Sequence, residues 1–470
     1  MDFTRRNVLI GIGLATSGAL ASLPEAASAA ISSSKSFSSV AALQTAIDAA
    51  NPGDILTLAP GTYPDSLITV STNNVTILSE IPGKAIFNGS SHIVIKASNT
   101  IFKGFQFLNG DYPGIVIRVF GSDNYLQDLN FFGYSAQKYI NLEAGGQRNE
   151  IAYCNFENKP ISAPSGNLVG VLAHPTIPGF HRIRFCSFKN ILGSGGDNGN
   201  EPIRLGLGAL SAFASRTIVE YCYWENTGLG DSENISVKSR ENVIRYCTFQ
   251  NNKEGMLVFR NGDDNMAYGN SFINAGGIRV KEASNIFCFN NYFEYSGVGG
   301  GASSVQLEYL PGNLRNINFL FNTFHNCGPI DLGGIGPTLN HWSNNLFVKT
   351  SGPIFMAPNK STQWLGNIYQ GSLGLSATVG LKFGAPKFTH KVNDYYRPII
   401  TSINRLSSVT GYSTPSMYQG LSPLNPLNQD LLRTARPLKT NQWDVGAIQF
   451  TKNLGTIGWL SSKTTGPRYS

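Results

Sequence analysis

The sequence repeats one short phrase, which reads NEIAYCNF (149–156), HRIRFCSF (181–188), RTIVEYCYW (216–224) and ENVIRYCTF (241–249). Each copy alternates apolar and polar residues and ends on an aromatic residue, as a short strand with one buried face does. Cys gives way to Asn in later copies, and from Cys154 onward these positions are 21 to 36 residues apart. That spacing lies within the range of solenoid repeats.

Second apolar alternations lie between the phrases, at 92–96, 114–118, 139–142, 168–172, 202–205, 235–238, 257–260 and 278–281. Short strands, aromatic positions and an Asn ladder at this spacing predict an all-β chain, a right-handed parallel β-helix of roughly ten or more coils. A β-propeller is the nearest rival. Its blades repeat at a steadier spacing of about 40 to 50 residues, and the intervals here vary too much.

The residues ahead of the first strand predict a cap for this solenoid. Val40, Leu43 and Ile47 stand at helical spacing, and Asn-Pro-Gly-Asp at 51–54 ends the pattern. A short amphipathic helix here would cover the core at the N-terminal end.

Residues 1–29 are typical of an export signal of twin-arginine type, because Arg5-Arg6 precedes a short apolar run that ends in small residues. A membrane anchor is the alternative reading, and no later segment reaches a spanning length. We therefore expect a periplasmic or secreted protein. Its β-helix catalytic domain would occupy 30–385, with terminal coils and a C-terminal wrap at 386–470.

Composition suits an acidic partner. The formal net charge is +7, a modest excess spread over the sequence, which suits an acidic substrate without singling one out, and we expect no nucleic-acid partner. Four of the six cysteines, Cys154, Cys186, Cys222 and Cys247, occupy the same position of the repeat. Stacked parallel positions make poor disulfide geometry, so we expect a buried ladder of free thiols.

The candidate site lies in DSENISVKSRENVIRYCTFQNNKEGMLVFRNG, residues 231–262. Lys238 and Arg260 each close an apolar alternation, so their side chains point away from the core. If the two strands belong to successive coils, these cations emerge side by side, roughly 5 Å apart. Asp231 and Glu233 lie just before Lys238 and supply the acidic part of the cluster.

This combination suits the cleavage of a uronic-acid polymer without water, by removal of the C5 proton and expulsion of the C4 oxygen. A divalent cation on the uronate carboxylate would stabilise the intermediate. Ca²⁺ takes oxygen ligands. Asp231 and Glu233 can provide two of them, and Asn200 on the preceding coil a third.

In this reading Lys238 is the base, because the neighbouring Arg260 disfavours the charged form of the lysine. Arg260 steadies the leaving oxygen. Arg204 and Arg279, on the coils before and after, would hold neighbouring carboxylates. None of the six histidines lies in the central stretch, and only His174 is placed to line the groove.

Other interpretations stay open at this point. The charged residues could be ordinary solvated side chains of a non-catalytic carbohydrate-binding or adhesive protein. Asp263-Asp264 resembles the paired acids of β-helical glycoside hydrolases, but no second acidic motif accompanies it, and we expect these acids to be solvated in a loop. A pectate lyase is disfavoured because its acidic calcium stripe is missing.

The motifs as a set resemble polysaccharide lyase family six, which includes alginate lyases and chondroitinase B, the lyase for dermatan sulfate. They are listed in chain order as NExIRxG (200–206), ExISVKS (233–239), GxLxxRxG (255–262), GNxF (269–272) and GGIRV (276–280). The resemblance covers about residues 35–390. It implies a right-handed β-helix, β-elimination with Lys238 as Brønsted base and Arg260 as Brønsted acid, and Ca²⁺ held by Asn200, Asp231 and Glu233.

Two positions depart from the family pattern. Asn261 follows the arginine where the family usually has His, which affects the contacts of the substrate-binding side chains. Asp231 stands where Glu is commoner, which affects how the metal sits. The expected function is an exported alginate lyase, with a dermatan sulfate lyase as the second candidate. The preference for mannuronate or guluronate stays open.

Overall fold

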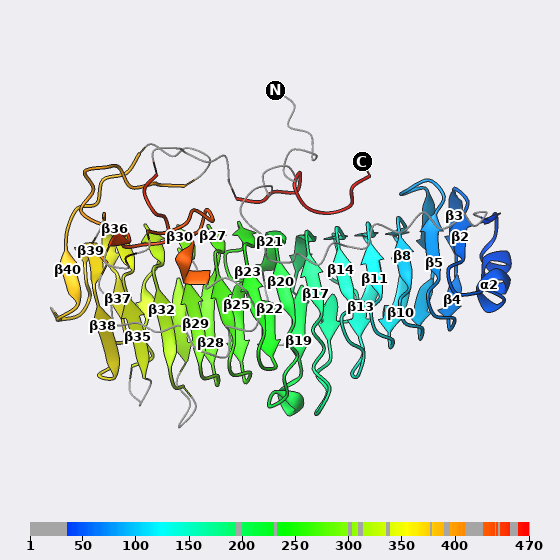
Figure 1. Ribbon diagram of the computed structural model, residues 1–470, viewed down its shortest axis with the longest axis horizontal. Helices are drawn as coiled ribbons and strands as arrows, with labels where there is room; N and C mark the ends of the chain where they lie inside the picture. The colour runs from blue at the N-terminus through cyan, green and yellow to red at the C-terminus, as the bar shows by residue number, and fades with distance from the viewer. Residues whose placement is uncertain are drawn as a thin grey trace.

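The computed structural model describes residues 35–193, 200–229, 233–298, 303–308, 314–334, 339–376, 378–389, 395–405, 407–408, 426–437, 439, 442–451 and 459–469. Their strands stack into an elongated parallel β-helix of about 13 turns, with pairs between successive coils running parallel (Figure 1). The predicted right-handed parallel β-helix is therefore confirmed. The proposed export signal lies outside the described residues and stays a prediction.

Each coil contributes a strand to three sheets, which form the walls of the solenoid. Sheet A has 14 strands in the described part of the chain. They are β1 (Lys35–Phe37), β2 (Ile55–Leu58), β5 (Thr76–Ser79), β8 (Ile101–Lys103), β11 (Tyr125–Gln127), β14 (Glu150–Ala152), β17 (Arg182–Arg184), β20 (Ile218–Glu220), β23 (Val243–Arg245), β26 (Met266–Tyr268), β29 (Ile286–Phe289), β32 (Ile317–Leu320), β35 (Asn340–Ser343) and β38 (Thr362–Leu365).

Sheet B also has 14 strands among the described residues. They are β3 (Gly61–Pro64), β6 (Ala85–Asn88), β9 (Gln106–Leu108), β12 (Asn130–Phe132), β15 (Asn155–Glu157), β18 (Ser187–Leu192), β21 (Tyr223–Leu229), β24 (Thr248–Gln250), β27 (Ser271–Ile273), β30 (Tyr292–Glu294), β33 (Thr323–His325), β36 (Leu346–Pro353), β39 (Asn367–Ser372) and β40 (Leu381–Phe383).

Sheet C has 12 strands within the described ranges and contains the second alternations of the repeat. They are β4 (Leu67–Val70), β7 (His92–Ile95), β10 (Asp111–Val119), β13 (Ser135–Leu142), β16 (Val169–Val171), β19 (Ile203–Gly206), β22 (Glu233–Lys238), β25 (Met256–Arg260), β28 (Gly277–Lys281), β31 (Val305–Glu308), β34 (Ile330–Asp331) and β37 (Phe355–Met356). The candidate site lies on this wall.

The aromatic residues that end each phrase form a continuous stack inside sheet B. Ring centroids of successive coils lie 4.4 to 5.3 Å apart from Phe107 to Phe347, a run that includes Trp224. The rings are nearly parallel, because each repeats the position of the one before it. This stack holds the register of the coils and so the alignment of the strands that carry the site.

The Cys and Asn positions form the predicted ladder at the corner between sheets A and B. All six cysteines are buried and free, as expected. The Cys247 N–H donates to Asn270 Oδ1 (3.0 Å), and the Asn270 N–H donates to Asn291 Oδ1 (3.0 Å). The same pattern continues to Asn367, so buried amides satisfy the main chain of the corner.

The predicted N-terminal helix is present as α2 (Val40–Asp48) and packs against β2 and β4 at one end of the solenoid (Figure 1). Ser39 accepts a hydrogen bond from the Ala42 N–H (3.2 Å) as N-cap. Leu43 and Ile47 are buried against the first coils. No helix in the described part of the chain is long and apolar enough to cross a membrane.

The last part of the chain returns along the solenoid. Leu431, Leu432 and Ile448 pack against Ile273 and Tyr292 of sheet B. The final described residues then run back toward the cyan coils (Figure 1). The C-terminal segment therefore touches coils that are far from it in sequence.

Candidate active site

Strand register places Lys238 and Arg260 at neighbouring positions on the outer face of sheet C. In β22 and β25, Val237 pairs with Phe259, so the next residues along the two strands are Lys238 and Arg260. Val237 and Phe259 are fully buried in the core, and alternation turns the two cations outward. The predicted side-by-side arrangement on one wall is present.

The outward column that contains these cations extends over several coils. Gly206 pairs with Lys238, Arg260 with Lys281, and Lys281 with Glu308. Gly206 has φ +90°, and a Cβ there would come 2.3 Å from the Lys238 carbonyl oxygen. Glycine is therefore required at this strand end.

Arg204 and Arg279 lie on the same face but in the adjacent outward column. Arg204 pairs with Ser236, and Val258 pairs with Arg279, so two small or apolar residues separate the arginines in this column. The two arginines therefore flank the Lys238 and Arg260 pair at the coil before and the coil after, as predicted.

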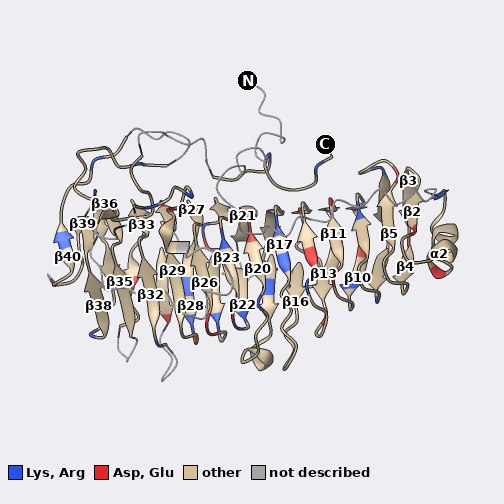
Figure 2. Cartoon of the chain, viewed as in Figure 1, with Lys and Arg blue, Asp and Glu red and all other residues tan. Residues whose placement is uncertain are grey.

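Each of these cations has a carboxylate partner. Glu201 lies 3.4 Å from Lys238 Nζ through Oε1, and 3.5 Å from Arg204 Nη1 through Oε2. Glu233 Oε1 accepts a hydrogen bond from Arg260 Nη1 (3.1 Å). Charged residues of both signs accordingly lie close together on the middle coils near β22 and β28 (Figure 2).

Glu308 is the carboxylate partner of the two cations on β28. It forms ion pairs with Arg279 and with Lys281, the latter at 3.4 Å. The outer face of these coils is thus a set of paired charges whose side chains hold each other in place, rather than a bare cationic stripe.

Glu201 and Glu233 are buried, with exposed fractions of 2%. Burial raises the pKa of the Glu201 carboxyl, Lys238 and Arg204 act to lower this pKa, and the nearby charge of Glu233 adds to the rise. Two carboxylates close together in a buried place make a favourable environment for a cation between them.

Asn200 immediately precedes Glu201 and is 3% exposed. Its Nδ2 donates to the Leu192 carbonyl (2.9 Å), whereas its Oδ1 is buried and has no hydrogen-bond partner among the described residues. A buried, unpaired amide oxygen beside carboxylates fits an oxygen ligand of a hard cation. Asp231 lies outside the described residues, and those that are described contain no cluster of three His, Cys, Asp or Glu side chains suited to a metal.

Two other predicted substrate contacts, Asn261 and His174, form their hydrogen bonds with residues outside these ion pairs. Asn261 follows Arg260 with φ +65° at the end of β25, and its amide donates to Glu282 of the next coil. His174 lies in the loop after β16, where its Nδ1 accepts hydrogen bonds from the N–H groups of Thr176 and Ile177 (both 3.2 Å). Among the described residues, His174 forms no ion pair or hydrogen bond with Lys238 or Arg260.

The expectation that Asp263-Asp264 are solvated is wrong for Asp264. This residue is 1% exposed, forms an ion pair with Arg240 and accepts a hydrogen bond from Asn285 (2.8 Å). It joins successive coils at the corner after sheet C, which is a structural role.

Sequence reasoning missed Glu201 and Glu308 as members of the cluster. Glu201 stood inside the motif that contains Asn200 and Arg204. Glu308 closes the apolar alternation of β31 in the same way that Lys238 closes that of β22. This shared position at the strand end is the signal that could have found Glu308.

Comparisons with known proteins agree with this fold. A family model described as chondroitinase B matches residues 37–316. The solved PL6 family alginate lyase AlyGC superposes with a TM-score of 0.69 at 22% identity over 78% of this chain and 55% of that one. This chain therefore spans about half the length of that enzyme. No curated protein matches the sequence.

Two further solved structures are matched over most of their own length. One is a mannuronic acid specific polysaccharide family 6 lyase from human gut microbiota, which superposes with a TM-score of 0.64 at 24% identity, over 75% of this chain and 90% of that one. The other is the PL6 family polysaccharide lyase Pedsa3628 from Pseudopedobacter saltans. It superposes with a TM-score of 0.59 at 19% identity, over 81% of this chain and 99% of that one. At these identities the likeness establishes the shared fold. Because the family model covers more than half of the sequence, the chain belongs to the chondroitinase B family of polysaccharide lyases, polysaccharide lyase family six.

Proposed function

We propose that this protein cleaves alginate by β-elimination and releases oligosaccharides with an unsaturated terminal sugar. The observation that carries the proposal is the adjacent placement of Lys238 and Arg260 on the outer face of sheet C, above the buried carboxylates Glu201 and Glu233. Membership of the lyase family supports the reaction class. Three solved relatives described as alginate lyases support the substrate.

In the proposed reaction, Lys238 Nζ takes the proton from C5 of the uronate at the cleavage point. The electron pair of that C–H bond forms the C4–C5 double bond as the C4–O bond breaks. Arg260 donates a hydrogen bond, and then a proton, to the departing oxygen. Arg204 and Arg279 hold the carboxylates of neighbouring sugars, with Asn261 and His174 at the edge of the site.

Glu201 affects this proton transfer in a way that the sequence did not predict. Its carboxylate lies 3.4 Å from Lys238 Nζ and 3.5 Å from Arg204 Nη1, so it holds the proposed base and a proposed substrate-binding arginine in place. Burial raises the pKa of the Glu201 carboxyl.

The defining test is a comparison of variants on alginate and dermatan sulfate, with ultraviolet absorbance reporting the unsaturated product. We expect alginate to be cleaved, and Lys238→Ala and Arg260→Ala each to lose roughly 10²- to 10⁴-fold in kcat, as loss of a proton-transfer group does. Lys281→Ala removes the next cation of the same column and should cost less than about tenfold.

The outcomes separate the alternatives. Cleavage of dermatan sulfate alone would favour the second substrate, which the description of the matched family model suggests. Equal losses in all three variants, or a product without the double bond, would contradict the assignment of Lys238 and Arg260. Binding of alginate without any cleavage would indicate a carbohydrate-binding protein.

We also propose a Ca²⁺ site formed by Asn200, Glu233 and Asp231. The unpaired Asn200 Oδ1 and the buried Glu233 support two of these ligands. Bound there, the ion would neutralise the uronate carboxylate and stabilise the negative charge that develops when C5 loses its proton.

Chelation should therefore abolish most of the activity, and added Ca²⁺ should restore it. Asn200→Ala should raise the Ca²⁺ concentration needed for half-maximal recovery by roughly tenfold or more, and should also reduce the rise in melting temperature that Ca²⁺ produces. Asn190→Ala, which alters an exposed asparagine on sheet B, is the control. Full activity in chelator would contradict the metal site.

A further inference from the structure

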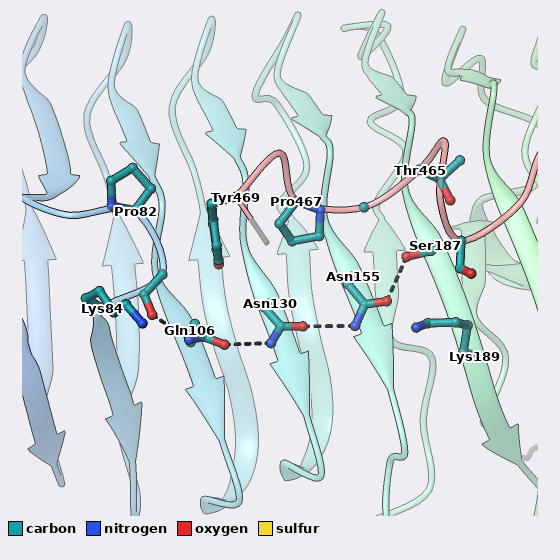
Figure 3. A pocket seen from close by; sticks show the side chains of 13 residues that line it. Pro82, Lys84, Gln106, Asn130, Asn155, Ser187, Lys189, Thr465, Pro467 and Tyr469 are labelled. Carbon is teal, nitrogen blue, oxygen red and sulfur yellow. Dashed lines mark hydrogen bonds between the residues drawn. The ribbon is translucent and has the colours of Figure 1, made fainter. Parts of the chain in front are cut away.

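A cavity of about 410 Å³ lies between the C-terminal segment 462–469 and the outer face of sheet B (Figure 3). Its floor comes from β9, β12, β15 and β18, whereas Lys238 and Arg260 lie on sheet C. The cavity is therefore separate from the site proposed for cleavage, and nothing in that function uses it.

The floor of the cavity is a ladder of polar side chains that repeats once per coil. Asn130 Nδ2 donates to Gln106 Oε1 (2.8 Å), and Asn155 Nδ2 donates to Asn130 Oδ1 (2.9 Å). Ser187 Oγ then donates to Asn155 Oδ1 (2.7 Å). Figure 3 shows these side chains in one row across four strands.

The ladder leaves hydrogen-bonding capacity toward the cavity. An amide has two N–H groups and two lone pairs on its oxygen. The bonds of Gln106 and Asn130 within the described part of the chain use one N–H and one lone pair of each. Two adjacent coils, roughly 5 Å apart, thus each present a free donor and a free acceptor. Paired donors and acceptors at such a spacing suit the hydroxyl groups of a sugar chain.

A lysine stands at each end of this ladder (Figure 3). Lys84 is exposed and forms no ion pair with any described residue, while Lys189 is paired with Glu157 (2.5 Å). One cation is therefore available for a ligand carboxylate, beside a row of groups that recognise hydroxyls.

The roof of the cavity is anchored on both sides. Arg468 forms a two-pronged ion pair with Asp128, at 2.7 and 3.0 Å, and the Gly466 N–H donates to the Phe185 carbonyl (2.8 Å). Tyr469 OH donates to the Phe105 carbonyl (3.2 Å). These anchors hold the C-terminal segment across the ladder, which turns an open wall into a partly covered groove.

We propose that this cavity binds a segment of an acidic oligosaccharide, with hydroxyl groups on Gln106 and Asn130 and a carboxylate on Lys84. Such a site would hold polymer or product on a wall where no cleavage takes place. A uronate chain combines both groups that the cavity recognises, whereas a neutral glucan would leave Lys84 without a partner.

Hydrogen–deuterium exchange of the full chain tests this directly, with oligomannuronate and oligoguluronate as probes and the Lys238→Ala variant used to prevent cleavage. We expect these probes to slow exchange of the N–H groups in 462–469, and neutral cello-oligosaccharides to do so only at much higher concentration. Lys84→Ala should weaken the effect at least about tenfold, because it removes the charge that the carboxylate needs. Lys96→Ala, an exposed lysine that does not line the cavity, should leave it unchanged.

Asn130→Ala provides a second variant, with its melting temperature measured to confirm that it folds. The proposal is overturned if the acidic probes slow exchange only around β22 and β25, or nowhere. It is equally overturned if Lys84→Ala and Asn130→Ala bind as the parent does. Protection by neutral and acidic probes alike would overturn the role of Lys84.

Discussion

Glu201 is the residue through which the charges of the candidate site are balanced. It contacts both Lys238 and Arg204 and is almost fully buried. Glu201→Gln keeps the shape of the side chain and removes its charge. Lys238 and Arg204 then lose the carboxylate that both of them contact.

We expect the kcat/KM of Glu201→Gln on alginate to fall roughly 10- to 100-fold, because two cations lose the contact that orients them. Steady-state rates on alginate measure this loss. Glu150→Gln is a matched control, since Glu150 pairs with Arg184 (3.0 Å) on sheet A, away from the site. Equal rates for Glu201→Gln and the parent would contradict the orienting role of Glu201.

Lys238 and Arg260 could be predicted from sequence because each ends an apolar alternation, and alternation alone decides which face a side chain takes. Glu233, the partner of Arg260, was expected in the acidic part of the cluster, whereas Glu201, the partner of Lys238, was not. Glu201 precedes β19, and its contact with Lys238 depends on how that turn passes over the next coil. Sequence spacing does not determine such a path.

At the scale of elements, His181 occupies a position of the coil at which the two preceding coils have Asn124 and Asn149. The Asn124 N–H donates to Asn149 Oδ1 (2.9 Å), and the Asn149 N–H in turn donates to His181 Nδ1 (3.2 Å). Only neutral histidine can accept this bond. Burial lowers the pKa of His181 to about 4.

This lowered pKa makes stability depend on pH. Between about pH 6.5 and about pH 4 the unfolded chain binds a proton that the folded chain does not, so the contribution of His181 is complete above about pH 6.5 and is lost on acidification. The loss amounts to about 3 kcal/mol by pH 4. His181→Asn should remove that part of the pH dependence while keeping an acceptor in the ladder.

Urea denaturation of the parent and His181→Asn across this pH range measures the difference in the free energy of unfolding. Burial also lowers the pKa of His341, which is only half-buried, so His341→Asn should change the pH dependence less. Parallel curves for the parent and His181→Asn would contradict the argument.

The strands themselves were predictable because the aromatic and Cys or Asn positions recur. The strands of sheet C match the predicted second alternations within a residue or two, except that β10 and β13 begin three and four residues earlier. The corners were not. Tyr153, Phe185, Tyr221 and Tyr246 turn the chain with φ between 53° and 56°, a conformation that aromatic residues seldom adopt. Their rings stack at 4.9 to 5.3 Å, so packing between coils outweighs local preference.

At the scale of the whole molecule, the C-terminal segment connects coils that are distant in sequence. A solenoid coil normally contacts only its neighbours. Here Leu460 N–H donates to Thr248 (3.0 Å), and Arg468 pairs with Asp128, 340 residues earlier. No periodicity in the sequence predicts which coils these residues contact.

The bond between Arg468 and Asp128 lets the strength of this connection be measured. The Asp128 side chain is 4% exposed, and the Arg468 guanidinium also lies 4.1 Å from the Tyr153 ring centroid. Arg468→Ala leaves the Asp128 carboxylate buried without this partner. We expect a loss of about 1 to 2 kcal/mol in the free energy of unfolding, discounted for the partial exposure of the arginine.

Arg148→Ala is the comparison that isolates burial as the cause. Arg148 holds Asp123 with the same two-pronged geometry (2.7 and 2.8 Å), but its side chain and that of Asp123 are 53% and 31% exposed. That pair should contribute less than about 1 kcal/mol. Since Arg468, unlike Arg148, fastens a segment across the solenoid, its loss should also speed amide exchange in 462–469, while Arg148→Ala should not. If Arg468→Ala and Arg148→Ala changed the free energy of unfolding and the amide exchange of 462–469 equally, the segment would be held by its other contacts. The ion pair with Asp128 would then contribute no more than an exposed ion pair does.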